Sequence, residues 1–582
     1  MANPSLSSLT VPVGFTLHTE NTSRILLPSN NEAFLNPVQE FNRDLSVAVI
    51  RVWSEELDRI KEDRWRQARE RRLAKAEKQS VDRKRRKVEE GDVQKTASVQ
   101  PDEVGTQTEG PVAISDAVTQ TKEAEYRPHK FVILEALSAT GLRSIRYAKE
   151  IPLVRYVIAN DLSPLATAAM TRNVELNGLG GTATDGNCPD ADSDATRRPE
   201  GKGKVRVNEG DARILMYSHA PERNRVDVVD LDPYGTAAPF IDAGVQCVVD
   251  GGLLCVTCTD LSVLATNNYP EKCYSNYGGV SVKAEYSHEA ALRLVLHTIA
   301  TSAARYGRYI EPLLCLSIDF YVRMFVKVQT APIQVKKVAS QTSVYYVCSG
   351  CQSFHEQPFG RMTEKVNDRG GKANILFKTH VGPPVPEKCP ECGSPLHIAG
   401  PMWNGRIHDP QFVGRVLEHL ECSEDNYGTS ARMKGMLTVA KEELAVPFYF
   451  TPSRVASFFH CTCPSLDEIA SALLHAGHQV SRSHAAPGSL KTTATRRDLH
   501  DVYRCWVKTH PVKVEKIPPN SPARVLLQKE PSFEADFASH PLTVSQSSKV
   551  KLVRYQPNPA PNWGPATRAD SGVKRKRRDR DE

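Results

Sequence analysis

The segment VDVVDLDPYGTAAPF places two carboxylates, a proline and a tyrosine at the end of an apolar run. The valines and the leucine of residues 226–231 predict a buried strand, and a proline stops further ladder pairing. Asp230, Asp232, Pro233 and Tyr234 are therefore expected at the exit of that strand. There, a carboxylate and a backbone carbonyl can each accept one N–H of an amine, and a tyrosine ring can stack on a planar base. The isolated tripeptide Asp-Pro-Tyr is equally compatible with a strand end and a capping aspartate.

Acidic residues also follow three earlier predicted strands. LEALSATGLRSIRY places Glu135 at a strand end ahead of a glycine-containing turn, and ANDLS and EGDAR place Asp161 and Asp211 at the next two. Asp161 is suited to accept hydrogen bonds from ribose hydroxyls. Asp211 can accept from an exocyclic amine while the N–H of Ala212 donates to a ring nitrogen. The first turn is not GxGxxG, which favours a nucleoside-type cofactor over a dinucleotide. Each acid alone can be a helix cap, but the ordered set is more specific.

A parallel sheet would bring these strand ends together. Residues 131–134 and 156–159 are short apolar runs, each followed by a helical pattern, and the alternation continues to about residue 330. This order predicts a doubly wound α/β fold. In such sheets ligands bind outside the carboxyl ends of the strands, which is where the acids lie.

The length of 582 residues predicts two folded domains with tails. We expect a first α/β domain over residues 1–334, with disordered inserts at about 56–126 and 183–202. The first insert is charged and helix-prone at its start, and both are poor in large apolar residues. A second, α+β domain is expected over 335–515. Residues 516–582 are rich in Pro and Ser, which predicts a largely extended tail, and this tail carries a basic run.

Charge and hydropathy indicate the compartment. The net charge is +7, with basic runs RKRRK and KRKRR, the second in the polar tail. We expect the second run to act as a nuclear-import signal. The sequence has neither a run of eighteen apolar residues nor an apolar leader, so a soluble intracellular protein without a membrane partner is expected. No Arg-rich transit helix is evident, and the mitochondrion is left open as a second address.

The fourteen cysteines are expected to be reduced thiols or metal ligands. Cys348-Ser-Gly-Cys351 and Cys389-Pro-Glu-Cys392 are two CxxC knuckles with turn-forming residues, suited to place four thiolates on one metal. The intervening residues 352–388 form a longer spacer than is common in zinc ribbons. The pattern predicts a structural zinc site with four cysteine ligands, with unliganded thiols as the alternative.

Taken together, these segments resemble the tRNA (guanine(26)-N(2))-dimethyltransferase family, which has the class I methyltransferase fold and uses S-adenosylmethionine (SAM). The resemblance covers essentially the whole chain outside the inserts. It is carried by FLNPVQEFNRDLSV (34–47), EALSATGLRSIRYAKE (135–150), DLDPYGTAAPFIDAG (230–244), LCVTCTDLSVL (254–264), RYIEPLLCLSIDFYVRMFVKV (308–328), SRSHAAPGSLKTTA (481–494) and NPAPNWGPATRA (558–569).

The resemblance implies the cofactor site. It assigns SAM contacts to Arg43, Arg143, Asp161, Asp211 and Ala212, and Glu135 is placed at the same site. The two arginines are suited to pair with the methionine carboxylate of SAM. The same resemblance supports zinc at the four cysteines. One departure is Asn21, where the family usually has glycine, so the geometry of that loop is in question.

The implied reaction transfers a methyl group from a sulfonium to a guanine amine, whose lone pair is delocalised into the ring. Asp232 would accept one N–H and take the proton, the Pro233 carbonyl would accept the other, and Tyr234 would pack on the base. Asp230 would either orient Asp232 or bind substrate, and the sequence does not separate these roles. Dimethylation further requires exchange of spent cofactor between the two transfers.

The implied partner is tRNA, held mainly by the second domain, with no obligate protein partner expected. Cations near the domain junction are candidates for phosphate contacts: Arg305, Arg308, Arg323, Lys327, Lys336 and Lys337. Two alternatives stay open. A SAM-dependent N-methyltransferase acting on another RNA, another nucleic acid or a protein amine would keep the Asp-Pro-Tyr segment but should not share the segment SRSHAAPGSLKTTA. A non-catalytic zinc RNA-binding protein would explain the cysteines and the charge but not four cofactor-type strand ends.

Overall fold

The computed structural model describes residues 11–29, 35–93, 125–181, 203–365, 374–543, 545 and 547–550. Its contacts divide the chain into a large compact unit, residues 1–52 with 131–582, and a small unit, residues 53–130. The insert predicted at 183–202, the basic run KRKRR and the segment 558–569 lie outside the described residues. Within the described ranges, no helix combines the length and the apolar character needed to cross a membrane.

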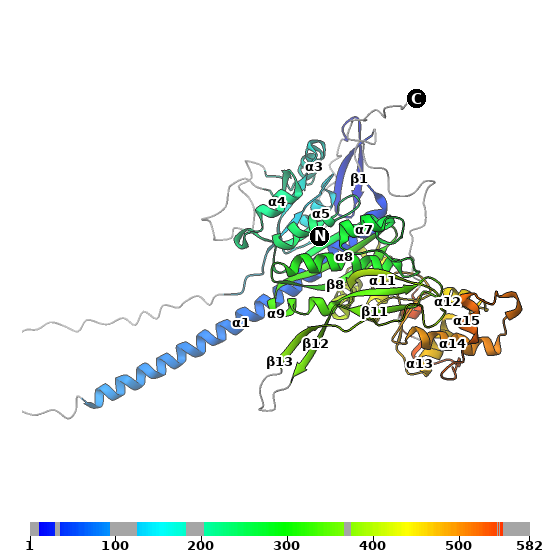
Figure 1. Ribbon diagram of the computed structural model, residues 1–582. Helices are drawn as coiled ribbons and strands as arrows, with labels where there is room; N and C mark the ends of the chain where they lie inside the picture. Colours follow the sequence, from blue (N-terminus) through cyan, green and yellow to red (C-terminus); the bar gives the residue numbers. More distant parts are fainter. Residues whose placement is uncertain are drawn as a thin grey trace, which may run out of the picture. The chain divides into compact units, whose positions relative to one another are not determined.

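The large unit contains a seven-stranded sheet. One of its strands, β8, is labelled in Figure 1. The strand order is β5-β4-β3-β6-β7-β9-β8. The first five strands in this order are parallel, and β9 runs antiparallel to both β7 and β8. The predicted doubly wound α/β fold is therefore confirmed. The bounds are β3 (Phe131–Glu135), β4 (Val154–Asp161), β5 (Val205–Glu209), β6 (Val226–Leu231), β7 (Val248–Cys258), β8 (Arg308–Ile318) and β9 (Tyr321–Thr330).

Helices pack around this sheet in two groups, in which α2 contacts α3, and α5 contacts both α4 and α8. This layering leaves the carboxyl ends of the parallel strands in loops at one edge. The bounds are α2 (Leu142–Glu150), α3 (Pro164–Leu176), α4 (Ala212–Ser218), α5 (Ala238–Cys247), α6 (Leu261–Leu264), α7 (Pro270–Tyr277) and α8 (Ser287–Ala304).

A glycine shapes the turn between β3 and α2. Gly141 has a φ of 79°, in the left-handed region that glycine adopts without strain. A Cβ at this position would lie 2.7 Å from Cγ of Met170 on α3. The turn therefore needs glycine, and it brings the first turn of α2, with Arg143, close to the carboxyl end of β3.

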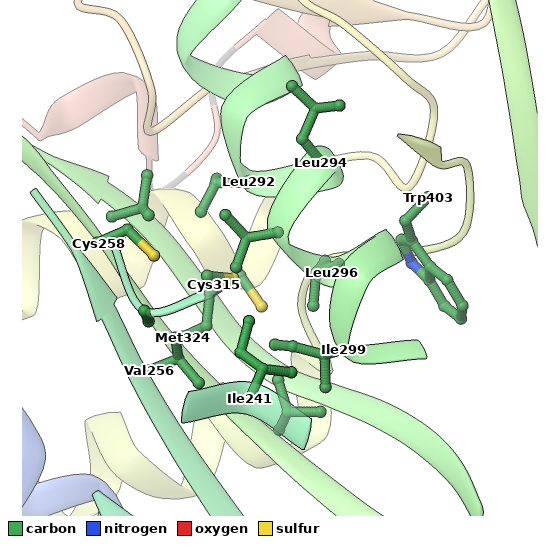
Figure 2. Packing of buried hydrophobic residues seen from close by; sticks show 14 of the residues in the cluster. Ile241, Val256, Cys258, Leu292, Leu294, Leu296, Ile299, Cys315, Met324 and Trp403 are labelled. Atoms are coloured by element: carbon green, nitrogen blue, oxygen red, sulfur yellow. The ribbon is translucent and has the colours of Figure 1, made fainter. Parts of the chain in front are cut away.

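Helix α8 contributes many side chains to the main hydrophobic core. Leu292 and Leu296 of α8 belong to one cluster with Val256 of β7 and Met324 of β9 (Figure 2). The same cluster includes Trp403, which lies beyond residue 334. The core is thus continuous across the expected domain boundary, and the division of the chain at 334 stays a prediction.

The rest of the large unit contains small sheets and a second group of helices. One sheet has the order β11-β10-β14, and β12–β13, β15–β16 and the N-terminal β1–β2 are two-stranded. The bounds are β1 (Phe15–Glu20), β2 (Ser23–Pro28), α9 (Pro332–Val335), β10 (Thr342–Cys348), β11 (Phe354–Pro358), β12 (Gly360–Lys365), β13 (Asn374–Thr379), β14 (Leu396–Trp403), α10 (Pro410–Cys422), α11 (Ser430–Glu442), α12 (Pro452–Phe459), α13 (Leu466–His475), β15 (Val480–Arg482), β16 (Leu490–Thr492), α14 (Arg496–Thr509) and α15 (Pro522–Gln528).

Strand β8 is the outermost strand on its side of the sheet, and its outer backbone groups bind a later part of the chain. The N–H of Ser317 donates to Nε2 of His484 (3.2 Å), and the N–H of Cys315 donates to Nδ1 of His408 (3.4 Å). The backbone N–H that follows His408 donates to the Leu313 carbonyl (3.0 Å). These contacts tie the second half of the chain to the sheet.

The structure differs from the predicted extended tail at its beginning. Helix α15 starts after Ser521, whose side chain accepts from the N–H of Arg524, and Leu526 is fully buried in the C-terminal core. Ser532 then donates to the carboxylate of Asp501 on α14 (2.6 Å). Ala523 is also buried, and Phe533 and Phe537 pack partly buried against the same core. These apolar residues are spaced irregularly and so give no local sign of a folded element.

Part of the insert that was predicted to be disordered, at about residues 56–126, is helical in the structure. Helix α1 (Glu40–Val93) continues through residues 56–93, where Glu, Arg, Lys, Ala and Gln favour helix. Asp58 of α1 accepts hydrogen bonds from the Tyr126 hydroxyl and the His129 N–H (2.7 Å each). Residues 94–124 of the same predicted insert lie outside the described residues.

Candidate active site at the carboxyl edge of the sheet

Six side chains form a buried group beside the end of β6, which we call the carboxyl-edge cluster: Glu135, Arg143, Tyr147, Asp230, Asp232 and Arg323. Asp230 is fully buried at its centre. Its two carboxylate oxygens accept from Nη1 of Arg323 (2.7 Å) and from the Tyr147 hydroxyl (2.6 Å). Burial alone would raise the pKa of Asp230, but the guanidinium groups of Arg323 and Arg143 outweigh it and lower this pKa. Asp230 is therefore an ionised carboxylate whose oxygens are already bonded.

Arg143 connects three acids in this cluster. Its Nη2 donates to Asp232, its Nη1 lies 3.7 Å from Asp230, and its Nε lies 3.6 Å from Glu135. Ser46 of α1 accepts a further bond from Arg143 (3.2 Å). The Asp232 side chain is 11% exposed, the largest exposure among these ion-pair partners. The cluster therefore opens toward solvent at Asp232.

Glu135 ends β3 on the buried side of the cluster. Burial raises the pKa of this carboxyl to about 7, although the Arg143 guanidinium and a hydrogen bond from Ser144 act in the opposite direction. Near neutral pH this group can therefore hold or release a proton without a large free-energy change.

The acids after β4 and β5 lie at the same edge and bind backbone N–H groups. Asp161 accepts from the N–H of Ala139 (3.0 Å) and of Ser163 (2.9 Å). Asp211 is the N-cap of α4 and accepts from the N–H of Arg213 (2.7 Å). The hydrogen bond from the Arg213 side chain lowers the pKa of Asp211 to about 2. Both carboxylates retain further lone pairs. Asp211 thus has the helix-capping role that such acids often have, whereas Ser163 caps the helix after Asp161.

Arg43 lies in a neighbouring buried network. Its Nε and Nη2 donate to the carboxylate of Glu20 (2.7 and 2.5 Å), which also accepts from Arg146 (2.7 Å). Glu20 ends β1, and Asn21 follows in the β1–β2 turn with a φ of 49°. Asparagine adopts this left-handed conformation more readily than most residues, so the turn forms without the expected glycine. No bond between Arg43 and the carboxyl-edge cluster is present among the described residues.

The loop after β6 presents the Asp-Pro-Tyr segment. Pro233 is buried, whereas the Tyr234 side chain is 52% exposed. Gly235 and Thr259 join this loop to the one after β7: the Gly235 N–H donates to the Thr259 hydroxyl (2.8 Å), and the Thr259 N–H donates to the Gly235 carbonyl (2.9 Å). The loop is therefore held at two points while an aromatic face remains accessible.

Two of the cations suggested for phosphate contacts are buried. Arg323 lies in the carboxyl-edge cluster, and Arg308 donates to the carbonyls of Val248 and Val249 (2.8 Å each). Tyr147, a central partner of Asp230, was not among the predicted site residues. An arginine inside an apolar strand, as in YVRMFV, indicates a buried acidic partner and is the sequence pattern that could have identified Arg323.

The four predicted cysteines come together at two adjoining turns. Cys348 ends β10 and Cys351 follows it, Cys389 and Cys392 precede β14, and all four are buried. Their Sγ atoms lie within 4.8 Å of one another, at 3.3 Å for Cys348–Cys392 and 3.8 Å for Cys351–Cys389. Tetrahedral zinc with Zn–S bonds of about 2.3 Å requires sulfur separations of about 3.8 Å. The geometry therefore fits a zinc site with four cysteine ligands.

Comparison with known proteins identifies the family. Residues 15–504 match the family described as N2,N2-dimethylguanosine tRNA methyltransferase. The chain belongs to this family. It is 42% identical over 552 residues to the tRNA (guanine(26)-N(2))-dimethyltransferase of Schizosaccharomyces pombe, covering 94% of this chain and 92% of that protein. The human protein of the same name is 41% identical over 557 residues, covering 96% of this chain and 78% of that protein.

Two further comparisons concern a yeast relative and a solved structure of the dimethylguanosine tRNA methyltransferase family. A Saccharomyces cerevisiae relative named as mitochondrial is 40% identical over 582 residues, covering 96% of this chain and 93% of that protein. The structure of Trm1 from Pyrococcus horikoshii, solved with S-adenosyl-L-methionine, superposes with a TM-score of 0.56 at 22% identity. It covers 85% of this chain and 99% of that one. This similarity supports the same fold, the class I methyltransferase fold expected from the sequence.

Proposed function

We propose that this protein is a SAM-dependent tRNA (guanine(26)-N(2))-dimethyltransferase, which transfers two methyl groups to the exocyclic amine of guanosine 26. Family membership and about 40% identity to curated enzymes of that name over most of the chain support the assignment. The structural observation that carries it is Asp232, bonded to Arg143 at the open side of a buried ionic cluster and followed by a half-exposed tyrosine.

The residues at the ends of β3, β4 and β5 fit a nucleoside cofactor. Asp161 retains acceptor capacity for ribose hydroxyls, and Asp211 retains it for an exocyclic amine. The N–H of Ala212 is at the first position of α4, where backbone donors have no intrahelical acceptor. We assign Arg43, Arg143 and Glu135 to the part of the site that binds the methionine moiety of SAM. When bound, SAM supplies an electrophilic methyl group on its sulfonium.

Asp232 is proposed as the residue that orients the amine and accepts its proton. Arg143 keeps the carboxylate in place, and one oxygen can accept an N–H of the guanine amine. The Pro233 carbonyl would accept the second N–H, and Tyr234 would stack on the base extruded from the tRNA. Fixing both N–H groups directs the nitrogen lone pair, which is the main requirement for a weakly nucleophilic amine.

Asp230 is proposed as a positioning residue. Its oxygens are bonded to Arg323 and Tyr147, and it is fully buried, so it has no open path to a substrate. It acts by holding Arg143, whose other nitrogen holds Asp232. Of the two roles left open by the sequence, the geometry favours orientation of Asp232.

The decisive experiment measures SAM-dependent formation of N2,N2-dimethylguanosine in an unmodified tRNA transcript by mass spectrometry. Asp232→Asn is expected to lower kcat by roughly 10²- to 10⁴-fold, because it removes general-base catalysis. A transcript with adenosine at position 26 is expected to give no product. Asp250→Asn, at the opposite end of the sheet, is the matched control and is expected to keep wild-type activity. Methylation at another guanosine, or of another RNA only, would overturn the assignment.

We propose structural zinc at Cys348, Cys351, Cys389 and Cys392. Buried thiolates at tetrahedral spacing support this assignment. Purified protein is expected to contain about one zinc per chain by elemental analysis. Cys351→Ser is expected to lower that ratio and the unfolding temperature, whereas Cys247→Ser, far from the cluster in sequence, is expected to keep the metal. Full-length protein that is stable and zinc-free would refute the site.

For localisation we propose nuclear import through KRKRR, residues 574–578. A fluorescent fusion of the whole chain should become cytosolic when these five residues are replaced by Gln. Retention in the nucleus would exclude this run as the signal. Mitochondrial fluorescence would add the second address that the named yeast relative suggests.

A further inference from the structure

The hydroxyl of Tyr321 is a buried polar group without a hydrogen-bond partner. Tyr321 is 4% exposed, and among the described residues no atom accepts from its hydroxyl or donates to it. Buried polar atoms in folded proteins are nearly always bonded, so an unpartnered hydroxyl requires an explanation. Tyr321 is absent from the predicted site residues and from the roles assigned above.

Tyr321 lies on the face of the sheet that carries the carboxyl-edge cluster, at the edge where Asp232 reaches solvent. Tyr321 and Arg323 are two residues apart on β9, so their side chains leave the same face of the sheet. On that face Arg323 reaches Asp230, which lies two strands away on β6. Leu231 pairs through Val256 of β7 with Met324, so the next residue, Asp232, comes level with Arg323, and Tyr321 lies two residues further toward the carboxyl edge. Asp232 is accordingly among the charged groups that act on Tyr321.

The turn that precedes Tyr321 is anchored in an unusual backbone conformation. Asp319 has a φ of 44°, in the left-handed region that aspartate, like asparagine, adopts more readily than most residues. Its carboxylate accepts from Arg432 of α11 (2.7 Å), and the Arg432 guanidinium lies 4.5 Å from the centre of the Phe41 ring. Phe320, at the tip of the turn, is 56% exposed. The turn is therefore anchored at Asp319 while its tip reaches solvent.

The protonation state makes Tyr321 a donor. Burial, together with the nearby Asp319 carboxylate, raises the pKa of Tyr321, so its phenol keeps the proton at neutral pH. The amine of guanine is flanked by N1–H on one side and by the acceptor N3 on the other. A carboxylate such as Asp232 accepts only, so it is complementary to N–H groups and not to N3. A neutral phenol near that carboxylate supplies the missing donor.

We propose that Tyr321 is a substrate-contacting residue whose hydroxyl donates a hydrogen bond to N3 of the target guanine. This inference rests on the proposed function and adds a determinant of base recognition to it. The bond to N3 and the bonds from the amine fix the base at two adjacent ring positions. The base then has one in-plane orientation relative to Asp232.

The test is a double-perturbation experiment with full-length enzyme. The first methyl transfer is measured as kcat/KM for wild type and Tyr321→Phe, on a tRNA with guanosine or with 3-deazaguanosine at position 26. On guanosine, Tyr321→Phe is expected to lower kcat/KM by about ten-fold. On 3-deazaguanosine, which has C–H in place of N3, wild type is expected to fall similarly and the substitution to have no further effect. Tyr309→Phe, which removes a partly buried hydroxyl bonded to Gln341, is the matched control and should match wild type.

The outcomes separate this inference from the proposed function. Equal kcat/KM for wild type and Tyr321→Phe on guanosine 26, or an equal loss on both bases, would overturn the N3 contact while leaving the methyltransferase assignment intact. Weaker SAM binding by Tyr321→Phe in calorimetry would instead assign the hydroxyl to the cofactor and overturn the inference. No methylation of guanosine 26 by wild type would refute the proposed function. The unfolding temperature should not fall in Tyr321→Phe, because the hydroxyl has no partner in the free protein.

Discussion

Two buried ionic clusters in the large unit are built from similar residues but differ in their access to solvent. The carboxyl-edge cluster ends at Asp232, which reaches solvent. The second, which we call the junction cluster, consists of Glu289, Arg293, His408, Glu443, His484 and Lys491, all buried. In it, Lys491 Nζ lies 3.0 Å from both Glu289 and Glu443, and Arg293 lies 2.7 Å from Glu289. Its two acids and two cations balance, so every charge is neutralised inside the protein.

The difference separates two uses of buried charge. A sealed, balanced cluster fixes how two parts of the chain meet, because any separation would expose unpaired charge. An open cluster keeps one carboxylate charged and oriented where a ligand can reach it. We therefore expect substitutions in the junction cluster to change mainly stability and substitutions in the carboxyl-edge cluster to change mainly activity.

Lys491→Met is expected to have the largest effect on stability. It leaves the buried carboxylate of Glu443 without its cation, which should lower the free energy of unfolding by about 3–5 kcal/mol. Urea denaturation followed by circular dichroism measures this change. Adding Glu443→Gln should recover part of the loss. Unchanged stability of the single variant would contradict the sealed-cluster interpretation.

Acid should weaken the junction cluster. Burial lowers the pKa of His408 to about 4, despite the nearby Glu443 carboxylate, from a usual value of 6.5. The stability from neutral His408 is therefore complete above pH 6.5 and is lost as pH falls toward 4, by roughly 3 kcal/mol in total. Unfolding free energies measured from pH 7 to 4 test this dependence. His297, whose pKa burial also lowers to about 4, contributes a similar slope. The difference between wild type and His408→Gln isolates the His408 part, and equal slopes would refute it.

Arg143→Lys should reduce activity more than stability. Lysine keeps the charge but cannot contact three acids through a planar guanidinium, so Asp232 loses its fixed orientation. We expect kcat/KM to fall by about a hundred-fold, or roughly 2.7 kcal/mol. The urea midpoint should change little. Arg406→Lys, at an exposed ion pair, serves as the control. If Arg143→Lys lowered stability but kept full activity in the folded state, the carboxyl-edge cluster would serve stability, which contradicts the expected difference between the two clusters.

Tyr147→Phe should have the smallest effect of this series. The hydroxyl bond to Asp230 would be lost, but Arg323 and Arg143 still neutralise that carboxylate. A loss of about 1.5 kcal/mol in unfolding free energy is expected for a hydrogen bond to a charged group, with a few-fold change in kcat. Calorimetric unfolding and initial rates provide the two readouts. A larger effect on kcat than that of Arg143→Lys would mean that Asp230 acts in the reaction directly.

The sequence predicted the features that local patterns encode. The strand ends at Glu135, Asp161 and Asp211 follow from apolar runs and turns, and the two CxxC knuckles define the cysteine site by spacing. Residues 56–93 of helix α1 were predicted to be disordered. A charged, helix-prone stretch without an apolar stripe does not show from its sequence whether it forms a helix or stays disordered. The docking of α15 was not predicted for a related reason, because its few apolar residues, such as Leu526 and Phe533, are spaced irregularly.

The charge partners could not be predicted because they are distant in sequence. Arg323 and Asp230 form an ion pair across a neighbouring strand, and Lys491 joins two acids that belong to other parts of the chain. Nothing in the sequence next to Arg323 separates a buried arginine from a surface one except its apolar flanks. Likewise, an orphaned hydroxyl such as that of Tyr321 is visible only when all its neighbours are known.

The imidazoles of His408 and His484 have a consequence for solubility. By accepting from the outward N–H groups of Cys315 and Ser317, they occupy sites where another strand would otherwise pair. An uncovered, apolar edge strand is a template for association between molecules. Two side chains from two distant segments thus act as a substitute strand, and the enzyme gains protection from edge-to-edge aggregation at β8 without lengthening its sheet.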